Sequence, residues 1–307
     1  MKRRTHLAVV GAMTAISLCV FAVPTPAQTS SSTASSQAGT FNTSQDKTLA
    51  HVDRANKLIG KEIKSSDNQR IGKLDNLVVD LETGRILYAL IGSGGVGKVG
   101  ETRYAVAPGL FTEADNSLMI NVDKQKLTGA PQFTSEMEKN GQLNQADFVY
   151  KVYQYFGQNA WWQGKTAPNE GTFHNTHLAN DVIGMKIQNV NNETMGKVDN
   201  LAVDLPAGRV VYVILNPDSS LNLGNNYYAL PPDAFTLASD QKSLSSDINK
   251  DKLAAAPHFD KNNWAQLSDT QFASQVYQYY GKQAWFQTGG TFKPTGRTGE
   301  RSYPEKK

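Results

Sequence analysis

The sequence has almost no cysteine, because Cys19 is the single one among 307 residues. It lies in an apolar run near the start of the chain, which we expect to be removed during export. A mature chain without cysteine cannot form a disulfide. Its stability therefore has to come from the burial of apolar side chains in cores.

The sequence also lacks an excess of charge of one sign. It holds 31 basic and 28 acidic residues, and removal of Lys2, Arg3 and Arg4 would make the two numbers equal. A neutral protein lacks the positive surface that nucleic-acid binders use, so we expect no nucleic-acid partner. The one local excess of basic residues is the tail, 287–307, which we expect to be flexible.

Only one long apolar run is present, from Leu7 to Val23. It follows three basic residues and precedes a small residue, Ala27, which is the pattern of a secretory signal peptide over 1–27. The run is short for a membrane span. An uncleaved anchor and a lipoprotein modified at Cys19 are the alternatives, although Leu18 stands where a small residue would precede a lipidated cysteine. We therefore expect an exported, periplasmic protein.

Next comes a leader, 28–52, that is rich in Ser, Thr and Gln and has few large apolar residues. Such a composition cannot bury enough surface to fold, and predicts disorder. Beyond the leader, one long segment occurs twice, as 53–162 and 179–286, with 163–178 as a linker. An offset of 124 carries Gly72 onto Gly196 and Tyr88 onto Tyr212. A repeat this long is a domain duplication.

The best-matched part of each copy is an apolar strand, a tight turn and a second apolar strand. The two turns run from Asp80 to Arg85 and from Asp204 to Arg209. Gly84 and Gly208 stand where a four-residue loop needs a positive φ, and the two Asp side chains can accept hydrogen bonds from turn amides. The predicted structural turn residues are Asp80, Gly84, Arg85, Asp204, Gly208 and Arg209.

The second strand of each hairpin is apolar on both faces, so another element must cover it. The candidate cover is a helix, because apolar residues after each hairpin recur on one helical face. They are Phe148, Val149, Val152, Tyr155 and Phe156, and in the second copy Phe272, Ala273, Val276, Tyr279 and Tyr280. Asn144 and Ser268 are the expected N-caps. Gly157 and Gly281 fit the helix ends.

Each copy resembles the PRC-barrel domain. The resemblance is carried by the Gly-Lys pair, the Asp-Asn-Leu-Val-Val-Asp-Leu strand, the Gly-Arg turn, the apolar Tyr strand and the Tyr-Ala-Val-Ala-Pro segment. The resemblance covers roughly 55–133 and 179–259. It implies a mainly β fold with α appendages: two small antiparallel β-barrels, each followed by a short helical segment. The family shares no catalytic residues, and its members mostly contact other macromolecules.

The segment Gly92–Lys98 fits the spacing of a phosphate-binding loop, G-x-x-x-x-G-K. We interpret it as a hairpin loop, because Val99 replaces the hydroxyl residue that holds Mg²⁺. In addition, a strand rather than a helix is predicted to follow the loop, so no helix N-terminus would face a phosphate. The second copy does not repeat the glycines. We therefore predict that the protein neither binds nor hydrolyses ATP.

Two sets of residues are of types that can bind metal ions, but their positions in the sequence do not fit a metal site. Asp75, Asp80 and Glu82 are separated by an apolar strand, which does not fit the short span of a Ca²⁺ loop. His174 and His177 have a zinc-like spacing, but they fall in the expected linker and have no duplicated partner. We predict no metal, no cofactor and no catalytic residue. Gly-Thr-Phe occurs three times, ending at Phe41, Phe173 and Phe292, either by chance or to dock linkers.

Aromatic residues near the end of each copy are the candidate partner-binding residues, since Tyr and Trp often anchor binding surfaces. Ordinary packing over the barrel is the alternative. These residues are Tyr153, Trp161, Trp162, Tyr277, Trp285 and Phe286.

The predicted function is a non-catalytic binding or scaffolding role with a protein partner of the bacterial cell envelope. One alternative is an enzyme with a site between the barrels. Another is a protein that associates weakly with the envelope surface through its basic tail and aromatic residues.

Overall fold

The computed structural model describes residues 49–286, with the exception of 94–101, 115–116, 163–171 and 241. The predicted signal peptide, nearly all of the leader, the tail and most of the Gly-rich loop lie outside the described residues. Within the described part, no helix is both long and apolar enough to cross a bilayer. All described elements belong to one compact unit of the chain.

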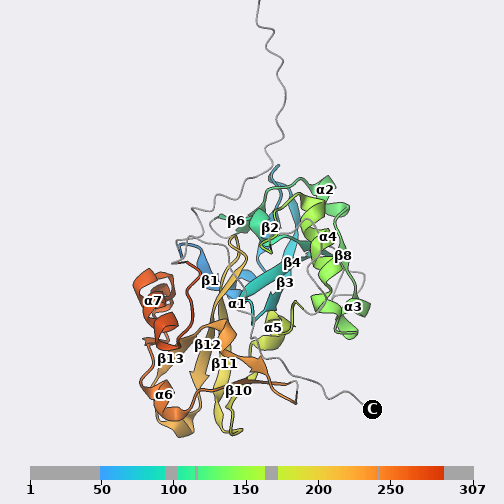
Figure 1. Cartoon of the computed structure of the whole chain (residues 1–307). Helices are drawn as coiled ribbons and strands as arrows, with labels where there is room; N and C mark the ends of the chain where they lie inside the picture. Colours follow the sequence, from blue (N-terminus) through green and yellow to red (C-terminus); the bar gives the residue numbers. More distant parts are fainter. Residues whose placement is uncertain (1–48, 94–101, 115–116, 163–171, 241, 287–307) are drawn as a thin grey trace, which may run out of the picture. The chain divides into compact units, whose positions relative to one another are not determined.

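The described residues form a 16-stranded sheet with short helices around it (Figure 1). The strands of the first copy are β1 Val52–Arg54, β2 Glu62–Lys64, β3 Arg70–Asp80, β4 Arg85–Ser93, β5 Thr102–Val106, β6 Phe111–Ala114, β7 Ser117–Ile120 and β8 Gln132–Phe133. Those of the second copy are β9 Thr176–Leu178, β10 Lys186–Asn189, β11 Thr194–Asp204, β12 Arg209–Pro217, β13 Asn226–Leu230, β14 Thr236–Leu237, β15 Ser243–Ser246 and β16 His258–Asp260.

Helices are few and short, and the two longest follow the strands of each copy. In the first copy they are α1 Ala55–Leu58, η2 Pro108–Leu110, α2 Lys124–Thr128, α3 Ser135–Lys139, η3 Gln142–Asn144 and α4 Ala146–Phe156. In the second copy they are α5 Ala179–Val182, η4 Ser219–Leu221, η5 Pro232–Ala234, α6 Lys250–Ala254, η6 Trp264–Ser268 and α7 Thr270–Tyr279. The fold is therefore mainly β with few helices, as predicted.

The strand pairing differs from two purely antiparallel barrels. Most pairs are antiparallel, but β2 runs parallel to β7 and β10 runs parallel to β15. Parallel neighbours are possible here because a long stretch of chain separates the two members of each pair. No pair among the described strands joins β6 to β8, so the pairs do not close the first copy into a ring. The observed sheet is large, mixed and shared by both copies.

The long hairpins β3–β4 and β11–β12 are the centre of each copy, and their turns have the predicted geometry. Each hairpin has a four-residue loop, and Gly84 and Gly208 have φ values of 60° and 62°. Asp80 accepts a hydrogen bond from the Thr83 amide at 2.8 Å, and Asp204 accepts one from the Ala207 amide at 3.0 Å. These two predictions are confirmed.

A short strand from each copy pairs with the long hairpin of the other copy. β1 lies antiparallel to the end of β11, with Asp53 opposite Val203. β9 lies antiparallel to the end of β3, with His177 opposite Val79. Figure 1 shows the blue strand β1 among the orange elements of the second copy. We expected 163–178 to be a linker and Val52 to belong to the leader, but both segments contain strand residues. Three-residue strands have too little periodicity to be found from a sequence.

The core extends through both copies. Every residue from Ile86 to Gly92 is buried, as predicted for a strand covered on both faces. The cover is α4, where Phe148 packs edge-on against Tyr88 with ring centroids 5.4 Å apart. In the second copy, Phe272 of α7 packs edge-on against Tyr212, and the ring of Tyr277 lies tilted against the same Tyr212 ring. The predicted helical faces are confirmed at most positions, but Tyr155 is exposed, and Tyr153 and Tyr277, which the predicted faces left out, are buried.

Candidate functional site

The two hairpin turns meet each other where the copies join. Arg85 and Arg209 are opposite residues of β4 and β12. The Ile86 amide donates to the Gly208 carbonyl at 3.0 Å, and the Val210 amide donates to the Gly84 carbonyl at 3.1 Å. The junction at these turns is thus a continuous piece of sheet. The predicted turn residues lie together here, and their contacts join the copies.

Asp80 also ties the second copy to the first. Besides the Thr83 amide, it accepts hydrogen bonds from the Thr83 hydroxyl, the Asn175 amide and the Thr176 hydroxyl, all within 3.1 Å. Its side chain is fully buried. Four donors from the protein therefore surround this carboxylate, as the interpretation of Asp80 as a turn-stabilising residue requires. Among the described residues, no three His, Cys, Asp or Glu side chains are grouped as metal ligands would be.

The two linker histidines have different surroundings. His174 is exposed, whereas His177 lies in β9 and its Nε2 is 2.7 Å from the side-chain oxygen of Asn175. Burial lowers the pKa of His177, and the nearby carboxylates of Asp80 and Asp181 act in the opposite direction. His177 is thus part of the sheet that joins the copies, not of a solvated linker.

The candidate aromatic residues of the first copy form a packed cluster. Tyr153 is buried and lies edge-on to Trp162 at 5.2 Å, and Trp162 lies edge-on to Trp161 at 5.5 Å. The guanidinium of Arg85 stacks on the Trp161 ring at 4.8 Å. Phe173, from one of the three Gly-Thr-Phe segments, is buried against the same rings. This Phe docks onto the first copy, while the other two segments lie outside the described residues.

The second copy repeats the arrangement. Tyr277 is buried, donates its hydroxyl hydrogen to the Val211 carbonyl at 2.9 Å and lies edge-on to Phe286. Arg209 stacks on Trp285 at 4.8 Å. Burial raises the pKa of both Tyr153 and Tyr277. In the described structure, the six candidate residues pack against other residues of the same chain. A role for them in partner binding stays a prediction.

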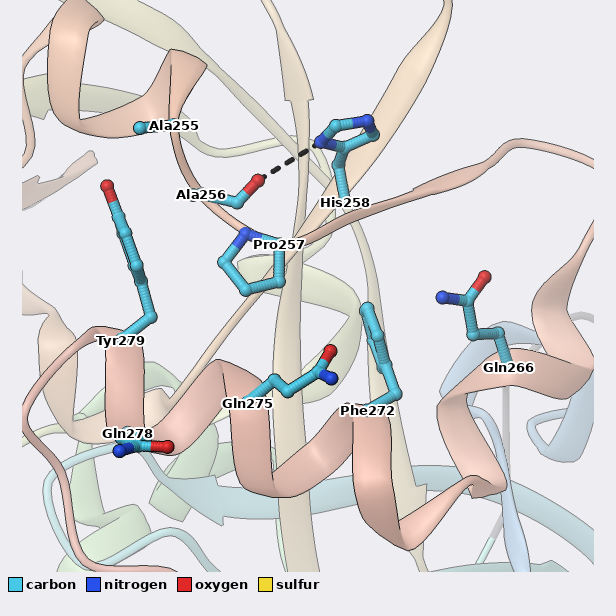
Figure 2. Close-up of a pocket in the computed structure, with 9 residues that line it drawn as sticks. All are labelled: Ala255, Ala256, Pro257, His258, Gln266, Phe272, Gln275, Gln278 and Tyr279. Carbon is cyan, nitrogen blue, oxygen red and sulfur yellow. Dashed lines mark hydrogen bonds between the residues drawn. The ribbon is translucent and has the colours of Figure 1, made fainter.

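A surface groove lies elsewhere in the second copy, between α7 and the segment that leads from α6 into β16 (Figure 2). Its volume is about 590 Å³. Phe272, Gln275 and Tyr279 rise from the helix toward Pro257, while the ring of His258 is turned away from the helix and lies beside the Ala256 carbonyl. Ala255, Ala256, Gln266 and Gln278 complete the lining, so the nine lining residues include no Asp, Glu, Lys or Arg.

The groove offers neutral hydrogen-bonding groups beside apolar surface. Gln275 and Gln278 are exposed, whereas Phe272 is buried. His258 Nδ1 is 3.0 Å from the Ala256 carbonyl oxygen. A carbonyl only accepts, so Nδ1 carries the hydrogen and Nε2 of the neutral ring is an acceptor. The phenol of Tyr279 donates to the Lys252 carbonyl at 2.5 Å, which fixes its ring at one end of the groove.

Our sequence predictions missed this groove. Phe272 and Tyr279 were predicted only as packing residues of a helix, and His258 was assigned no role. The available signal was a difference between the copies, because Gln275 corresponds to Lys151 of the first copy and His258 corresponds to Gln132. Such differences indicate surface positions that are not needed for the fold that the two copies share.

The Gly-rich segment of the first copy connects two antiparallel strands. β4 ends at Ser93 and β5 begins at Thr102, opposite it in the sheet. A strand therefore follows the loop, as predicted, where a phosphate-binding loop would need a helix. Residues 94–101 themselves lie outside the described residues. Binding of ATP is not tested by this arrangement, and its absence stays a prediction.

The fold and its junction define a class: a tandem β-domain protein whose two copies share one sheet. The PRC-barrel domain family matches residues 50–127 and 174–253, which together make up half of the chain. The chain belongs to the PRC-barrel domain family and carries two tandem copies of that domain. No curated protein matches the chain as a relative.

Proposed function

We propose that the chain is a non-catalytic binding or scaffolding protein that holds a protein partner of the cell envelope. The observation that carries the proposal is the groove beside α7, where exposed Gln275 and Gln278 lie on the same helix as Phe272 and Tyr279 and no charged residue is among the lining residues. Few polar groups placed along an apolar concave surface are typical of a binding site.

The chemistry of the groove favours an extended peptide segment as its ligand. A glutamine amide has both a donor and an acceptor, which complement the C=O and N–H groups of a peptide backbone. Gln275 and Gln278 lie along one helix, and Gln266 lies at the far end, so the groups are spread along the groove (Figure 2). With no charged residue in the lining, burial of a neutral segment avoids the desolvation of an unpaired charge.

The shared sheet supports a scaffolding role. The two copies are joined by strand pairs at β1–β11, β9–β3 and β4–β12, so both copies belong to one continuous sheet, on which the groove lies. We also propose that each copy curls into a small, partly open barrel. The parallel pairs β2–β7 and β10–β15 support this idea, because they bring the later strands β7 and β15 back to the early strands β2 and β10.

The proposed place of action is the periplasm. The support is the sequence of the first 27 residues, with three basic residues, an apolar run from Leu7 to Val23 and a small residue at Ala27. This pattern is typical of a cleaved secretory signal. Detection of the mature chain in a periplasmic extract, with its N-terminus at Gln28, is the expected result. A chain retained at full length in the cytoplasm would contradict export.

The binding proposal is tested by capture with matched variants. Mature wild-type chain is immobilised, exposed to envelope extract, and its bound proteins are identified and then purified for titration. The groove variant combines Gln275→Ala and Gln278→Ala. The control combines Lys151→Ala and Gln154→Ala at the same positions of α4. We expect one protein to bind wild type and control alike, and the groove variant at least tenfold more weakly. Equal binding to all three chains would contradict the groove as the site.

A further inference from the structure

The chain closes on itself through its first described residues. Each long hairpin has one edge segment that its own copy leaves open, at Val78–Asp80 in β3 and at Ala202–Asp204 in β11. The first is filled by β9, the leading strand of the second copy. The second would need the leading strand of a third copy. It is filled instead by β1, which comes from the start of the chain.

We call residues 49–54 the arm, and the edge of β11 from Ala202 to Asp204 the slot. The arm is held in the slot by more than backbone pairing. Leu49 is buried, Val52 is partly buried opposite Asp204, and Arg54 stacks on the Trp264 ring at 4.8 Å. Just beyond the arm, the Asn56 amide lies 3.4 Å from the side-chain oxygen of Asn200.

A residue just beyond β9 makes a nearly identical contact with β3. The Asn180 amide lies 3.3 Å from the side-chain oxygen of Asn76. The repeat offset carries Asn56 onto Asn180 and Asn76 onto Asn200. The two contacts are therefore equivalent by the repeat. The contact of Asn180 with Asn76 joins the second copy to the first, and the contact of Asn56 with Asn200 joins the start of the chain to the second copy. Nothing in the chemistry of the slot requires that the arm come from the same molecule.

We propose that the slot on β11 is a docking site for an extended segment, and that the arm of a second copy of the chain can fill it. Exchange of an identical element between protomers is a low-cost route to dimers, because both states make the same contacts. Addition of a strand to an exposed sheet edge is a common mode of peptide recognition. In the closed chain the arm competes at an effective concentration on the order of millimolar, so exchange requires high protein concentration or a disabled arm.

The slot is tested with a variant whose own arm cannot dock. Leu49→Asp and Val52→Asp, made together in the full mature chain, place a charge at a buried anchor and a second carboxylate opposite Asp204. The probe is a synthetic peptide of residues 49–58, and its binding is followed through the fluorescence of Trp264. The control chain carries His51→Ala, an exposed position of the same arm. The control peptide carries the two Asp substitutions.

We expect saturable binding of the peptide to the arm variant and at least tenfold weaker binding to the wild type and the His51→Ala chain. If the arm variant does not fold alone, recovery of the native circular dichroism spectrum on addition of the peptide supports the proposal. Absence of both binding and recovery overturns it.

Exchange between complete chains is measured separately. Two populations with different affinity tags are refolded together at high concentration, and dimers that carry both tags are isolated. We expect mixed dimers from the wild type and from the His51→Ala chain, and at least a tenfold loss of them with the arm variant. Mixed dimers that form equally well with the arm variant would show that the arm is not the exchanged element, and would overturn the proposal.

Discussion

The two copies of the domain have the same frame but different surfaces. Position 103 of the first copy corresponds to position 227 of the second. In the first copy Arg103 forms an ion pair with Glu138 at 2.6 Å and faces Asp75 at 4.0 Å. In the second copy Tyr227 donates to Asp199 at 2.6 Å. Burial, with help from this hydrogen bond, raises the pKa of Tyr227 to about 12. One site thus carries a charge network in one copy and a neutral phenol in the other.

Positions inside the frame have not diverged in this way. Asp75 and Asp199 each lie at a register shift in the long hairpin, where a bulge turns one side chain outward. The glycines, buried asparagines and turn aspartates near these bulges are the same in both copies. The comparison indicates that the frame is fixed by backbone geometry, while the groove of the second copy is free to differ. The predictions below test that division.

The largest loss of stability is expected from substitutions at Gly72 and Gly196. A Cβ at Gly72 would fall well inside contact distance of the Gly92 carbonyl oxygen, and one at Gly196 would clash with the Asn216 carbonyl oxygen. Their φ values, 156° and 151°, also disfavour a side chain. Because the clash is with backbone, we expect Gly72→Ala to lower the free energy of unfolding by about 3 kcal/mol or more. Gly196→Ala should cost more, since Pro217 Cα is also only 2.9 Å from the added atom. Urea denaturation measures both, and unchanged midpoints would show that these bulges are adaptable.

A smaller loss is expected at the two turn glycines. Gly84→Val and Gly208→Val should each cost about 1–2 kcal/mol, because a Cβ is unfavourable at a left-handed φ. An added Cβ would lie 3.1 Å from Pro232 at Gly84 and 3.4 Å from Pro108 at Gly208. We therefore expect Gly84→Val to be the more damaging of the two in thermal melts. A melt that Gly84→Val leaves unchanged would contradict the turn geometry.

Similar losses are expected at the paired asparagines. Asn76 and Asn200 are buried, and each accepts a hydrogen bond from the next residue's amide, at 2.9 and 3.0 Å, besides the contact to the other copy. Replacement of either by Ala should cost about 1–3 kcal/mol, because buried amides lose their acceptor. Equal losses in the two variants, measured by urea denaturation, would confirm that the junction is symmetric. A loss at Asn76 alone would contradict it.

The smallest effect is a dependence on pH that only one side of the junction should show. His177 of β9 corresponds to Asp53 of β1. Burial lowers the pKa of His177, so the unfolded chain binds a proton more readily than the folded chain. Stability therefore falls as the pH drops through the ordinary histidine pKa of about 6.5. His177→Asn should reduce this fall in stability between pH 7.5 and 5.5. An unchanged pH profile would mean that other groups cause it.

Much of the frame could be predicted from the sequence because it depends on local rules. A four-residue loop with a glycine at its end, and apolar residues at helical spacing, determine the hairpins and α4 and α7 wherever they occur. The caps were less predictable. α7 begins one residue later than expected, with Asp269 as its N-cap. α4 also begins one residue later than expected, since its N-cap is Gln145, which makes no capping bond through its side chain, and the amide of Asn144 donates to the Phe173 carbonyl.

The junction and the groove could not be predicted, because both depend on tertiary packing. A three-residue strand such as β1 is too short for its apolar pattern to indicate which strand it pairs with. Its pairing with β11 depends on which sheet edge is open in the folded chain. The groove exists only because α7 and the segment around His258 lie some way apart. No residue type in it is unusual alone, and glutamines on an exposed helix face are ordinary. The differences of Gln275 from Lys151 and of His258 from Gln132 are the hints that the sequence contains.

The most direct test of the account is hydrogen–deuterium exchange on the mature chain, alone and with the protein that it captures. If the second copy holds the partner in its groove, amide protection will increase at 255–279, and the corresponding residues of the first copy, 129–155, will be unchanged. Protection that appears equally in both copies, or around Trp161 and Trp285 without the groove, would contradict the division between a common frame and a groove specific to the second copy.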